Sequence, residues 1–540
     1  MNALRPSLVL SALALLLGAC ARGGFEAALD SEPIIAIFDG AAFDSANGDR
    51  GVSDRALSDV GADAHSDGGP DDTSARDGPS VQDGHVDGAG REVSAERDPF
   101  DAGTASLIFD LIGPTSFDPE LTFAAPTSLA VDVAGATQYF EAALTFDTPL
   151  DVSAAGPQQV LFYFDPGGGA LTRLRADRDN LIALPQGVLA LTELRELYLF
   201  DNDIPGSIPV ELGALTSLGS LYLSLNQLTG EIPPELGSLV NLTNLNLYGN
   251  QLTGSIPAEL GALIHLYSLD LSHNQLSGPV PSELGRLTGL GILFLNHNQL
   301  SGSFPGAILE MASLHWLQLV ANQFSGPLPA ELGDLVHMDC LLIGGNSFTG
   351  SIPAELGNLT ALTELGLNGS QFSGAIPAEL GNLTRLHWLF LDDNQLTGAV
   401  PAELGNLVNL TWLHLNNNQL TGIASATVSH WTSIRELLLQ DNLFSEAAVD
   451  AIIDEIWSAR ASYGDATAAN VLDIGGSNAA PSGSATDPLQ TPGSGNSNSD
   501  WSWNSGTNCH RPLTGKARAF DLAHDVCGDG FQLWTVTCTP

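Results

Sequence analysis

Aromatic residues recur in this sequence at a few fixed positions of a repeating pattern. Each lies six, four, two or one residues before an asparagine that returns about every 24 residues, and aspartate, asparagine and histidine share these positions. Aromatic faces beside neutral and acidic hydrogen-bonding groups suit sugars or neutral-to-basic peptides. The candidate ligand-binding residues are Tyr198, Phe200, Tyr222, Tyr248, Phe294, Trp316, Trp388, Phe390, Asp392, Asp393, Trp412 and His414.

Two groups stand out among these residues, one near the start of the repeats and one near their end. No lysine or arginine occupies these positions. The alternative to binding is bracing, because strands about 4.8 Å apart bring equivalent aromatic rings into contact. The first group is Tyr198, Phe200, Tyr222 and Tyr248, and the second is Trp388, Phe390, Asp392, Asp393, Trp412 and His414.

Two histidines raise the question of a metal site. His273 and His297 hold the same position in adjacent repeats, with Asp270 nearby. Two imidazoles at that spacing can share one ion, but no third ligand of suitable geometry is evident, so we expect solvated histidines, no metal and no cofactor. The chain also lacks a recognisable nucleophile–base set and a glycine-rich phosphate loop, and we therefore do not expect an enzyme.

The elements that carry these residues are repeats that open as Leu-x-x-Leu-x-Leu-x-x-Asn, as in Leu242–Asn250. Alternating leucines indicate a strand whose apolar side faces inward. The asparagine stands where the chain leaves the strand, and its amide can satisfy backbone groups from repeat to repeat. Ser370 alone breaks the series, which predicts a locally weaker stack. The predicted ladder is Asn202, Asn226, Asn250, Asn274, Asn298, Asn322, Asn346, Asn394, Asn418 and Asn442.

The second half of each repeat, Leu-Thr-Gly-x-Ile-Pro-x-Glu-Leu-Gly, is more specific. With the first half it resembles the plant-type leucine-rich repeat of receptor-kinase ectodomains and polygalacturonase inhibitors. The resemblance implies an α/β solenoid with a parallel β-sheet on its concave face. It also implies turns, 3-10 and extended segments on the convex face. In that family the non-leucine strand positions face the concave side, which is where we expect the candidate residues.

The N-terminal segment resembles a bacterial lipoprotein signal. Residues 1–20 contain Arg5, an apolar run too short to span a bilayer, and the lipobox-like Leu17-Gly18-Ala19-Cys20. The resemblance implies cleavage before Cys20 and its lipidation, which would anchor the protein at the bacterial outer membrane or cell surface. Residues 21–101, rich in Asp, Gly, Ser and Ala, are expected to form a disordered acidic tether. The net charge of −44 argues against nucleic-acid binding.

The remaining parts are expected to close the two ends of the solenoid. Residues 102–168 carry short β-prone runs and predict a small β-rich capping domain; an enzyme hidden there is an alternative without a catalytic constellation. The solenoid occupies 169–478, and its first repeat is degenerate. That repeat carries Asn180 and Leu184-Pro185, but Arg175 and Asp177 stand where the apolar pair should be.

The C-terminal part begins with a predicted helix from Ser445 to about Tyr463, followed by a strand at 471–476. Residues 479–540 are expected to form a loop and a capping segment, with a helix near 516–524 and a strand at 531–537. Cys509 and Cys527 are the disulfide candidates in an exported protein. The pairing of Cys340 and Cys538 is left open.

Together these observations predict a non-catalytic recognition protein of the cell envelope. It would bind a protein, peptide or glycan through its concave face. The alternative is a structural or adhesive surface protein without a discrete ligand pocket. The sequence names neither the ligand nor the oligomeric state.

Overall fold

The residues that the structure describes all belong to one unit of the chain, residues 104–540. The computed structural model describes residues 107–112, 115–117, 119–133, 136–146, 150–152, 157–164, 169–459, 470–474, 477–478 and 534–537. The expectations for residues 1–101, the helix near 516–524 and the pair Cys509 and Cys527 lie outside these ranges.

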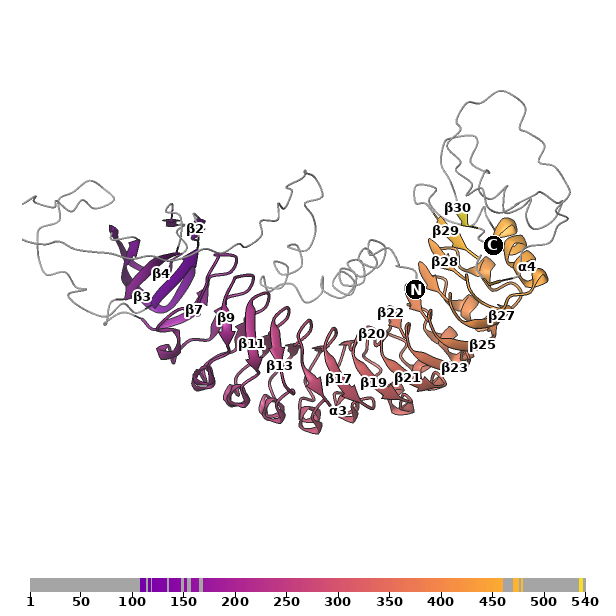
Figure 1. Ribbon diagram of the computed structural model, residues 1–540, viewed down its shortest axis with the longest axis horizontal. Helices are drawn as coiled ribbons and strands as arrows, with labels where there is room; N and C mark the ends of the chain where they lie inside the picture. Colours follow the sequence, from indigo (N-terminus) through magenta and orange to yellow (C-terminus); the bar gives the residue numbers. More distant parts are fainter. Residues whose placement is uncertain are drawn as a thin grey trace, which may run out of the picture. The chain divides into compact units, whose positions relative to one another are not determined.

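A long parallel sheet lines the inner edge of the repeat stack (Figure 1). Equivalent residues of its regular repeats pair with one another one repeat apart, for example Leu221 with Leu245 and Leu245 with Leu269. The predicted solenoid with a concave parallel sheet is therefore confirmed. The strands are β8 (Glu196–Tyr198), β10 (Ser220–Tyr222), β12 (Asn244–Asn246), β14 (Ser268–Asp270), β16 (Ile292–Phe294), β18 (Trp316–Gln318), β20 (Cys340–Leu342), β22 (Glu364–Gly366), β24 (Trp388–Phe390), β26 (Trp412–His414) and β28 (Glu436–Leu438).

A second set of parallel strands flanks this sheet, which the sequence interpretation described only as extended segments. Each strand follows a ladder position, and most include a glycine in the left-handed region, such as Gly230 with φ 79°. The strands are β9 (Pro205–Ser207), β11 (Gln227–Glu231), β13 (Gln251–Thr253), β15 (Ser277–Gly278), β17 (Gln299–Gly302), β19 (Gln323–Gly326), β21 (Ser347–Gly350), β23 (Gln371–Ala375), β25 (Gln395–Val400) and β27 (Gln419–Ile423).

Short helical turns follow the flanking strands on the convex side. Proline before or at the first turn fixes φ near −65°, and most turns are 3-10 helices. The glycine that ends Glu-Leu-Gly packs tightly, since a Cβ on Gly237 would meet Glu259 O at 2.4 Å. The turns are η3 (Val188–Ala190), η4 (Val210–Ala214), η5 (Pro234–Ser238), η6 (Ala258–Ala262), η7 (Ser282–Arg286), α3 (Gly306–Leu309), η8 (Ala330–Asp334), η9 (Ala354–Asn358), η10 (Ala378–Asn382), η11 (Ala402–Asn406) and η12 (Val428–His430).

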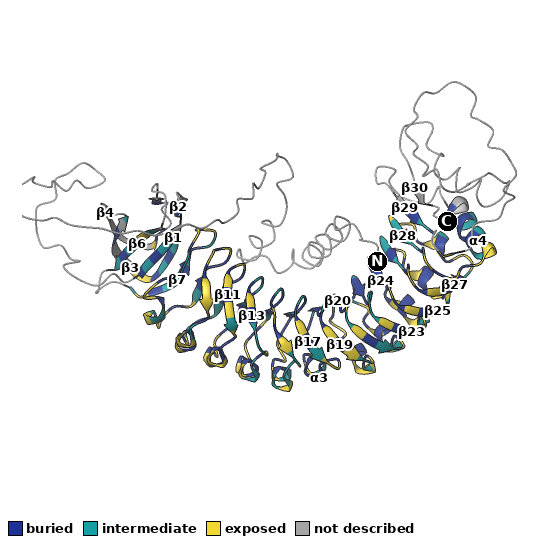
Figure 2. Cartoon of the chain, in the orientation of Figure 1, coloured by how far each residue is buried: buried dark blue, intermediate teal, exposed yellow. Residues whose placement is uncertain are grey.

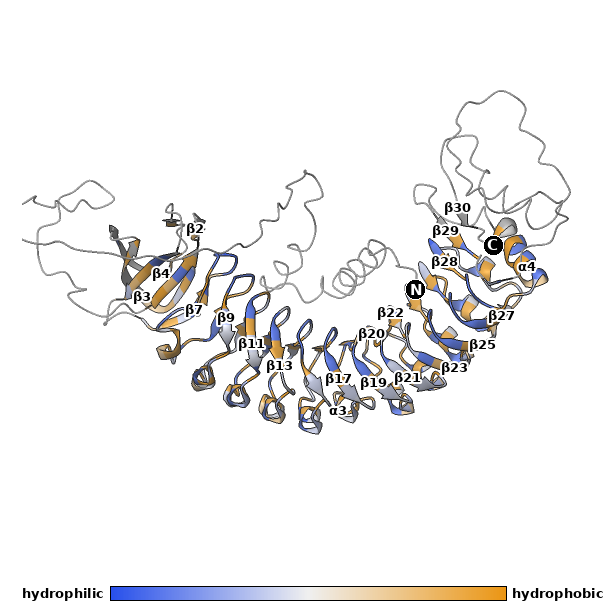
Figure 3. Cartoon of the chain, viewed as in Figure 1, coloured by the Kyte–Doolittle hydropathy of each residue, from blue (hydrophilic) through white to orange (hydrophobic). Residues whose placement is uncertain are grey.

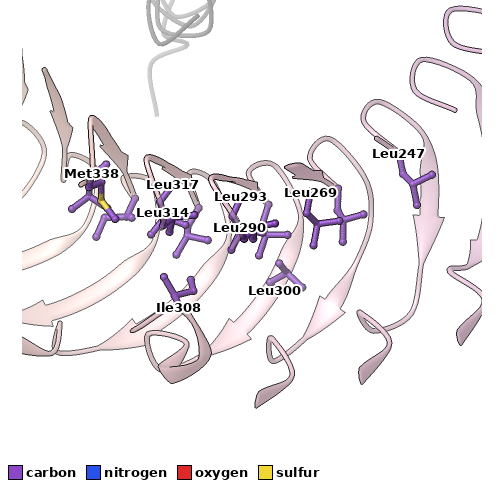
Figure 4. Packing of buried hydrophobic residues seen from close by; sticks show 14 of the residues in the cluster. Leu247, Leu269, Leu290, Leu293, Leu300, Ile308, Leu314, Leu317 and Met338 are labelled. Carbon is purple, nitrogen blue, oxygen red and sulfur yellow. The ribbon is translucent and has the colours of Figure 1, made fainter. Parts of the chain in front are cut away.

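The core is one continuous apolar cluster between the inner strands and the convex turns. Figure 4 shows leucines of successive repeats, including Leu269, Leu293 and Leu317, packed side by side. Figures 2 and 3 show the same layering as buried, apolar segments between more exposed, polar ones. Because each repeat buries its apolar side only against its neighbours, the stack is held together by contacts between adjacent repeats.

The ladder asparagines bond across each interface between repeats. Asn226 Nδ2 donates to Leu199 O at 2.8 Å and to Leu223 O at 3.2 Å, and its Oδ1 accepts from Ile204 N at 3.0 Å. The same pattern recurs at the other ladder asparagines. At Ser370 it is interrupted, because the buried hydroxyl oxygen has no hydrogen-bond partner.

The first repeat is in a different register from the one predicted. Leu174 pairs with Leu197, and Asn202 Oδ1 accepts from Leu181 N at 3.0 Å, as Asn226 Oδ1 accepts from Ile204 N. Asp179 therefore holds the ladder position, and the buried apolar pair is Leu174 and Ala176, not Arg175 and Asp177. The prediction failed because the pattern was read one residue too late in the chain, and a one-residue shift exchanges the two faces of a strand.

Strands before this repeat form the predicted β-rich region. The strand β7 (Leu171–Arg175) pairs with β3 antiparallel and with β8 in parallel, so the β-rich strands are hydrogen-bonded to the first repeat. The other strands are β1 (Leu107–Ile112), β2 (Thr115–Phe117), β3 (Glu120–Val133), β4 (Ala136–Phe146), β5 (Leu150–Val152) and β6 (Pro157–Phe164).

The helix α4 (Glu446–Ala459) covers the last repeats. Ser445 caps it, with Oγ accepting from Ala448 N at 3.2 Å, and the predicted inward residues Val449, Ile452, Ile453 and Ile456 are buried. The strand β29 (Asn470–Asp473) extends the inner sheet from β28, and β30 (Trp534–Thr537) pairs with β29. Among the described residues, no helix has the length and apolarity needed to cross a membrane.

Candidate functional site

The candidate residues fall into columns that run along the concave sheet. We name the columns by their distance before the ladder position: the first column is six residues before it, the second four and the third two. Adjacent strands pair column to column, so Trp388 pairs with Trp412 and Phe390 with His414. The residue one before the ladder, which we call the corner position, has a positive φ in every regular repeat, for example 54° at Asp393.

Aromatic rings at the N-terminal end of this face stack on one another. Tyr198 and Tyr222 have ring centroids 5.0 Å apart, and both side chains are buried together with Phe200. Burial raises the pKa of Tyr198 and of Tyr222, so both phenols stay protonated at physiological pH. Tyr248 lies further along the same face and is half-buried. The stacked rings of Tyr198 and Tyr222 therefore brace neighbouring strands.

Arginines also occupy this end, contrary to the expectation that the concave columns exclude basic residues. The shifted register places Arg173 in the first column and Arg175 in the second. Their guanidinium carbons lie 5.3 Å from the Tyr198 ring and 5.9 Å from the Phe200 ring. Arg178, at the corner position, also lies 5.9 Å from Phe200. Cation–π contacts of this kind stabilise both partners.

Each of these arginines has a carboxylate partner within the chain. Arg173 contacts Glu196 at 2.9 Å and Glu120 at 3.3 Å, and Arg175 forms an ion pair with the nearly buried Asp177. The hydrogen bond that Arg175 donates to the Asp177 carboxylate raises the pKa of Arg175. Arg178 contacts Asp201 at 3.3 Å. The cationic charge at this end is therefore neutralised internally.

A histidine pair follows in the next repeats. His273 and His297 stack with ring centroids 4.2 Å apart, and burial lowers the pKa of both, to about 4 for His273. The neighbouring Asp270 accepts from Ser272 N at 3.0 Å, and burial raises its pKa to about 6. Within the described residues no group of three potential ligands is arranged to hold a metal ion.

The middle of the face has smaller side chains. Phe294 is half-buried and Trp316 is buried, but the second column then continues as Gln318, Leu342 and Gly366. Glu364 is buried in the first column, which raises the pKa of its carboxyl group to about 8. Cys340, whose pairing was left open, lies beside Glu364 and is disulfide-bonded.

The C-terminal end of the face carries a second aromatic cluster. Trp388 and Trp412 have ring centroids 4.6 Å apart, and Phe390 lies 4.5 Å from the His414 ring. Trp388 and Phe390 are buried, whereas Trp412 and His414 are half-buried. The structure therefore brings the predicted second group together on adjacent strands.

A row of oxygens continues this cluster in the third column. Asp392 Oδ1, Asn416 Oδ1 and Gln440 Oε1 come from three consecutive repeats, and each is buried without a hydrogen-bond partner. Burial is the main cause that raises the pKa of Asp392 to about 6; the neighbouring Asp393 adds to the increase and His414 opposes it. Asp393 itself is exposed and accepts from Asn417 Nδ2 at 2.7 Å.

Two features of the face were absent from the predicted site. Gln440 and Glu436 complete the C-terminal cluster, and continuing the columns into the last regular repeat would have identified them. His315 Nδ1 and Asp339 Oδ2 lie 2.9 Å apart at the position seven before the ladder, which the column scheme did not include.

Known proteins share the repeat and its stacking. Leucine rich repeat family models match residues 217–239, 241–263, 264–324 and 384–444. The repeat region is a leucine-rich-repeat solenoid. No curated protein sequence matches the chain.

Solved structures similar to this leucine-rich-repeat solenoid come from plants and bacteria. A TDR receptor is 28% identical with a TM-score of 0.51, over 57% of this chain and 51% of that chain. The ectodomain of the plant membrane receptor kinase GASSHO1/SCHENGEN3 from Arabidopsis thaliana, in complex with CASPARIAN STRIP INTEGRITY FACTOR 2, is 31% identical with a TM-score of 0.42, over 50% and 38%. An internalin from Listeria monocytogenes is 24% identical with a TM-score of 0.44, over 53% and 78%. The chain spans about half the length of the TDR receptor.

A hollow on the convex side of the leucine-rich-repeat solenoid is a less specific candidate. Pro234, Gly237, Glu259 and Arg286 are among the residues that line it. Gly237 and Glu259 are consensus residues that recur in most repeats, whereas Pro234 and Arg286 hold variable positions, so most of the hollow's shape comes from the stacking of the turns. The side chains that differ between repeats gather on the concave face instead.

Proposed function

We propose that this protein is a non-catalytic recognition protein that binds a protein, peptide or glycan ligand through the C-terminal part of its concave face. The observation that carries the proposal is the row of Asp392 Oδ1, Asn416 Oδ1 and Gln440 Oε1 beside Trp388. A buried acceptor without a partner costs roughly 1–3 kcal/mol. Such a cost is understandable where a ligand supplies the missing donors, since folded proteins leave few buried polar groups unpaired.

The test is a peptide and glycan array probed with the chain lacking residues 1–20, followed by the variants Trp388→Ala and Trp412→Ala. A ligand of the concave site should lose affinity about tenfold with either change, because a packed aromatic contact is typically worth more than 1 kcal/mol. Tyr222→Ala is the matched control at the other end of the face. If both tryptophan variants bind every array ligand as the parent does, the concave-site proposal fails.

The second candidate function is a structural or adhesive surface protein without a discrete pocket. The stacked rings favour it, because Tyr198–Tyr222 and Trp388–Trp412 already brace adjacent strands. In that case the tryptophan variants would lower the midpoint of thermal unfolding and leave attachment of cells or surfaces unchanged.

We further propose that Cys20 carries a lipid anchor at the bacterial cell envelope, with residues 21–101 as the tether. The support is the lipobox-like end of the apolar N-terminal run. Labelling with a radioactive fatty acid tests it: the parent chain should incorporate label and fractionate with membranes, and Cys20→Ser should do neither. Label retained by Cys20→Ser would contradict the anchor.

A further inference from the structure

The oxygen row at the C-terminal end of the concave face limits the chemistry of a ligand. Asp392, Asn416 and Gln440 occupy the third column of three consecutive repeats, on strands about 4.8 Å apart. Their unpartnered atoms are all acceptors. Asn416 is only 7% exposed, so water has little access to its side chain and is a poor hydrogen-bond donor to its Oδ1. A group that satisfies this row must therefore be rich in donors.

Charge narrows the choice between a neutral donor and a cation. Asp392, Asp393, Glu436 and Asp441 all belong to these repeats, and His414 Nε2 lies 3.5 Å from Glu436 Oε1. The basic residues nearest in sequence, Arg385 and Arg435, lie outside the three columns. Ammonium and guanidinium groups have several donors and no acceptor, whereas a sugar hydroxyl brings acceptors that would meet these carboxylates.

The rings beside the row fit the apolar part of such a ligand. Trp388, Phe390 and Asp392 are alternate residues of one segment, and the Trp388 and Phe390 centroids lie 6.1 Å apart. Trp412 is half-buried in the neighbouring strand, so its ring keeps some exposed surface. Aromatic faces attract organic cations, and the aliphatic stem of a basic side chain packs well on them.

We infer that this end of the concave face is a subsite for a basic side chain, the ammonium of lysine or the guanidinium of arginine, presented by a peptide ligand. The charged group lies on the oxygen row of Asp392, Asn416 and Gln440, and its stem lies over Trp388 and Trp412. The inference rests on the proposed recognition function and names the class of ligand for that same site.

The probe is an acetylated, amidated Ser-Lys-Ser-Lys-Ser-Lys-Ser peptide, titrated calorimetrically at physiological salt to screen weak surface attraction. Its matched control carries Nε-acetyl-lysine, which keeps the stem and removes the charge. We expect the control peptide, whose lysine side chains are acetylated, to bind about tenfold more weakly than the lysine peptide or not at all. Equal affinity of the two peptides would overturn the inference.

Variants separate this subsite from general attraction to an acidic protein. Asp392→Asn and the charge-neutral Trp388→Ala should each weaken the lysine peptide about tenfold. Glu355→Gln removes an exposed carboxylate from η9 on the convex side and should leave affinity unchanged. Thermal unfolding of each variant verifies folding. If Asp392→Asn and Glu355→Gln weaken binding equally, the attraction is non-specific and the inference fails.

Further outcomes distinguish the inference from the proposed function. If array ligands bind in a Trp388-dependent manner but the lysine peptide does not bind, the recognition function stands and the basic subsite is wrong. If neither the array ligands nor the peptide respond to Trp388→Ala, both fail. Spermidine, a free polyamine, tests whether the cation must be part of a peptide. If spermidine binds more weakly than the lysine peptide, a side chain presented by a peptide is supported. If it binds more tightly, that inference is overturned.

Discussion

The two ends of the concave face have similar aromatic content and opposite polar states. At the N-terminal end, arginines lie over Tyr198 and Phe200, and each has a carboxylate partner. At the C-terminal end, Trp388 and Trp412 lie beside oxygens that have no partner. Aromatic residues alone therefore do not distinguish a binding surface from a braced one. The distinguishing feature is whether the charged and amide groups beside the rings have partners within the chain; the Ser224 hydroxyl at the N-terminal end is unpartnered as well.

The difference implies that substitutions at the two ends affect different properties. The arginine–carboxylate pairs at the N-terminal end form a closed network. It contributes to the free energy of unfolding, because removing one member leaves its partner without a counter-charge. The open C-terminal row already carries the cost of unsatisfied groups, so its removal should affect binding and cost little stability. The following predictions test this contrast.

The largest effect is expected from Arg175→Ala. This change leaves the nearly buried Asp177 carboxylate unpaired and removes the contact with Phe200, so it should lower the free energy of unfolding by about 3 kcal/mol. Urea denaturation monitored by circular dichroism measures it. Arg435→Ala, an exposed arginine at the other end, is the matched control and should change little. Equal losses from both substitutions would contradict a closed network at Arg175.

The pH dependence of stability tests the buried carboxyl group between the two ends. The pKa of Glu364 is about 8 in the folded chain against an ordinary 4.5, so the folded state holds a proton that the unfolded state releases. Stability is therefore lost as pH rises through 8, by about 2 kcal/mol between pH 6.5 and 8.5. Glu364→Gln should flatten this part of the profile in urea denaturation. A parent protein equally stable at both pH values would exclude the buried acid.

Asp392→Asn should stabilise the folded chain at pH 8 by about 1–2 kcal/mol. Burial raises the pKa of Asp392 to about 6, so ionisation above that pH opposes folding, and asparagine removes the charge. Besides burial, His414 and the backbone N–H of Asp392 lower its pKa and Asp393 raises it, and Asn368 holds the equivalent position in the preceding repeat. The gain should shrink at pH 5, where the carboxyl group is protonated. Destabilisation at pH 8 would show that Asp392 is satisfied within the chain.

The smallest effect is expected from Ser370→Asn, which restores the interrupted ladder between the two ends. An asparagine can bond backbone groups that the serine does not reach, and we expect a gain of about 1 kcal/mol. The midpoint of thermal unfolding should rise by a few degrees. Asn394→Ser, the reverse change one repeat later, should lower it. No change from either substitution would make the ladder dispensable for stability.

The repeat pattern was sufficient to predict the solenoid, its inner sheet and the position of the aromatic columns. Leucine spacing sets which side of a strand is buried, and the residues between them must face the other side. Val449, Ile452 and Ile456 likewise predicted the buried side of α4. These successes depend on local periodicity, which a single sequence displays directly.

The polar state of the columns was not predictable in the same way. The first repeat has a different register from the one predicted, so Arg175 lies on the concave face and not at the interior position assumed for it, and Arg173 lies on that face as well. Whether Asp392 or Asp177 has a partner depends on side-chain geometry between strands, which spacing does not reveal. The flanking sheet was missed because its strands begin just after the ladder residue, in a segment that the sequence interpretation assigned to a turn.

Because equivalent residues pair in register, the distance between two points on the concave sheet is set by the number of repeats between them. The two ends are separated by a whole number of repeats, and adding or deleting one unit changes their separation by a single strand spacing of about 4.8 Å. Neither end needs to be altered when the length between them changes. A protein built this way can be matched to a longer or shorter ligand by recombination between repeats, with its two chemically different ends preserved.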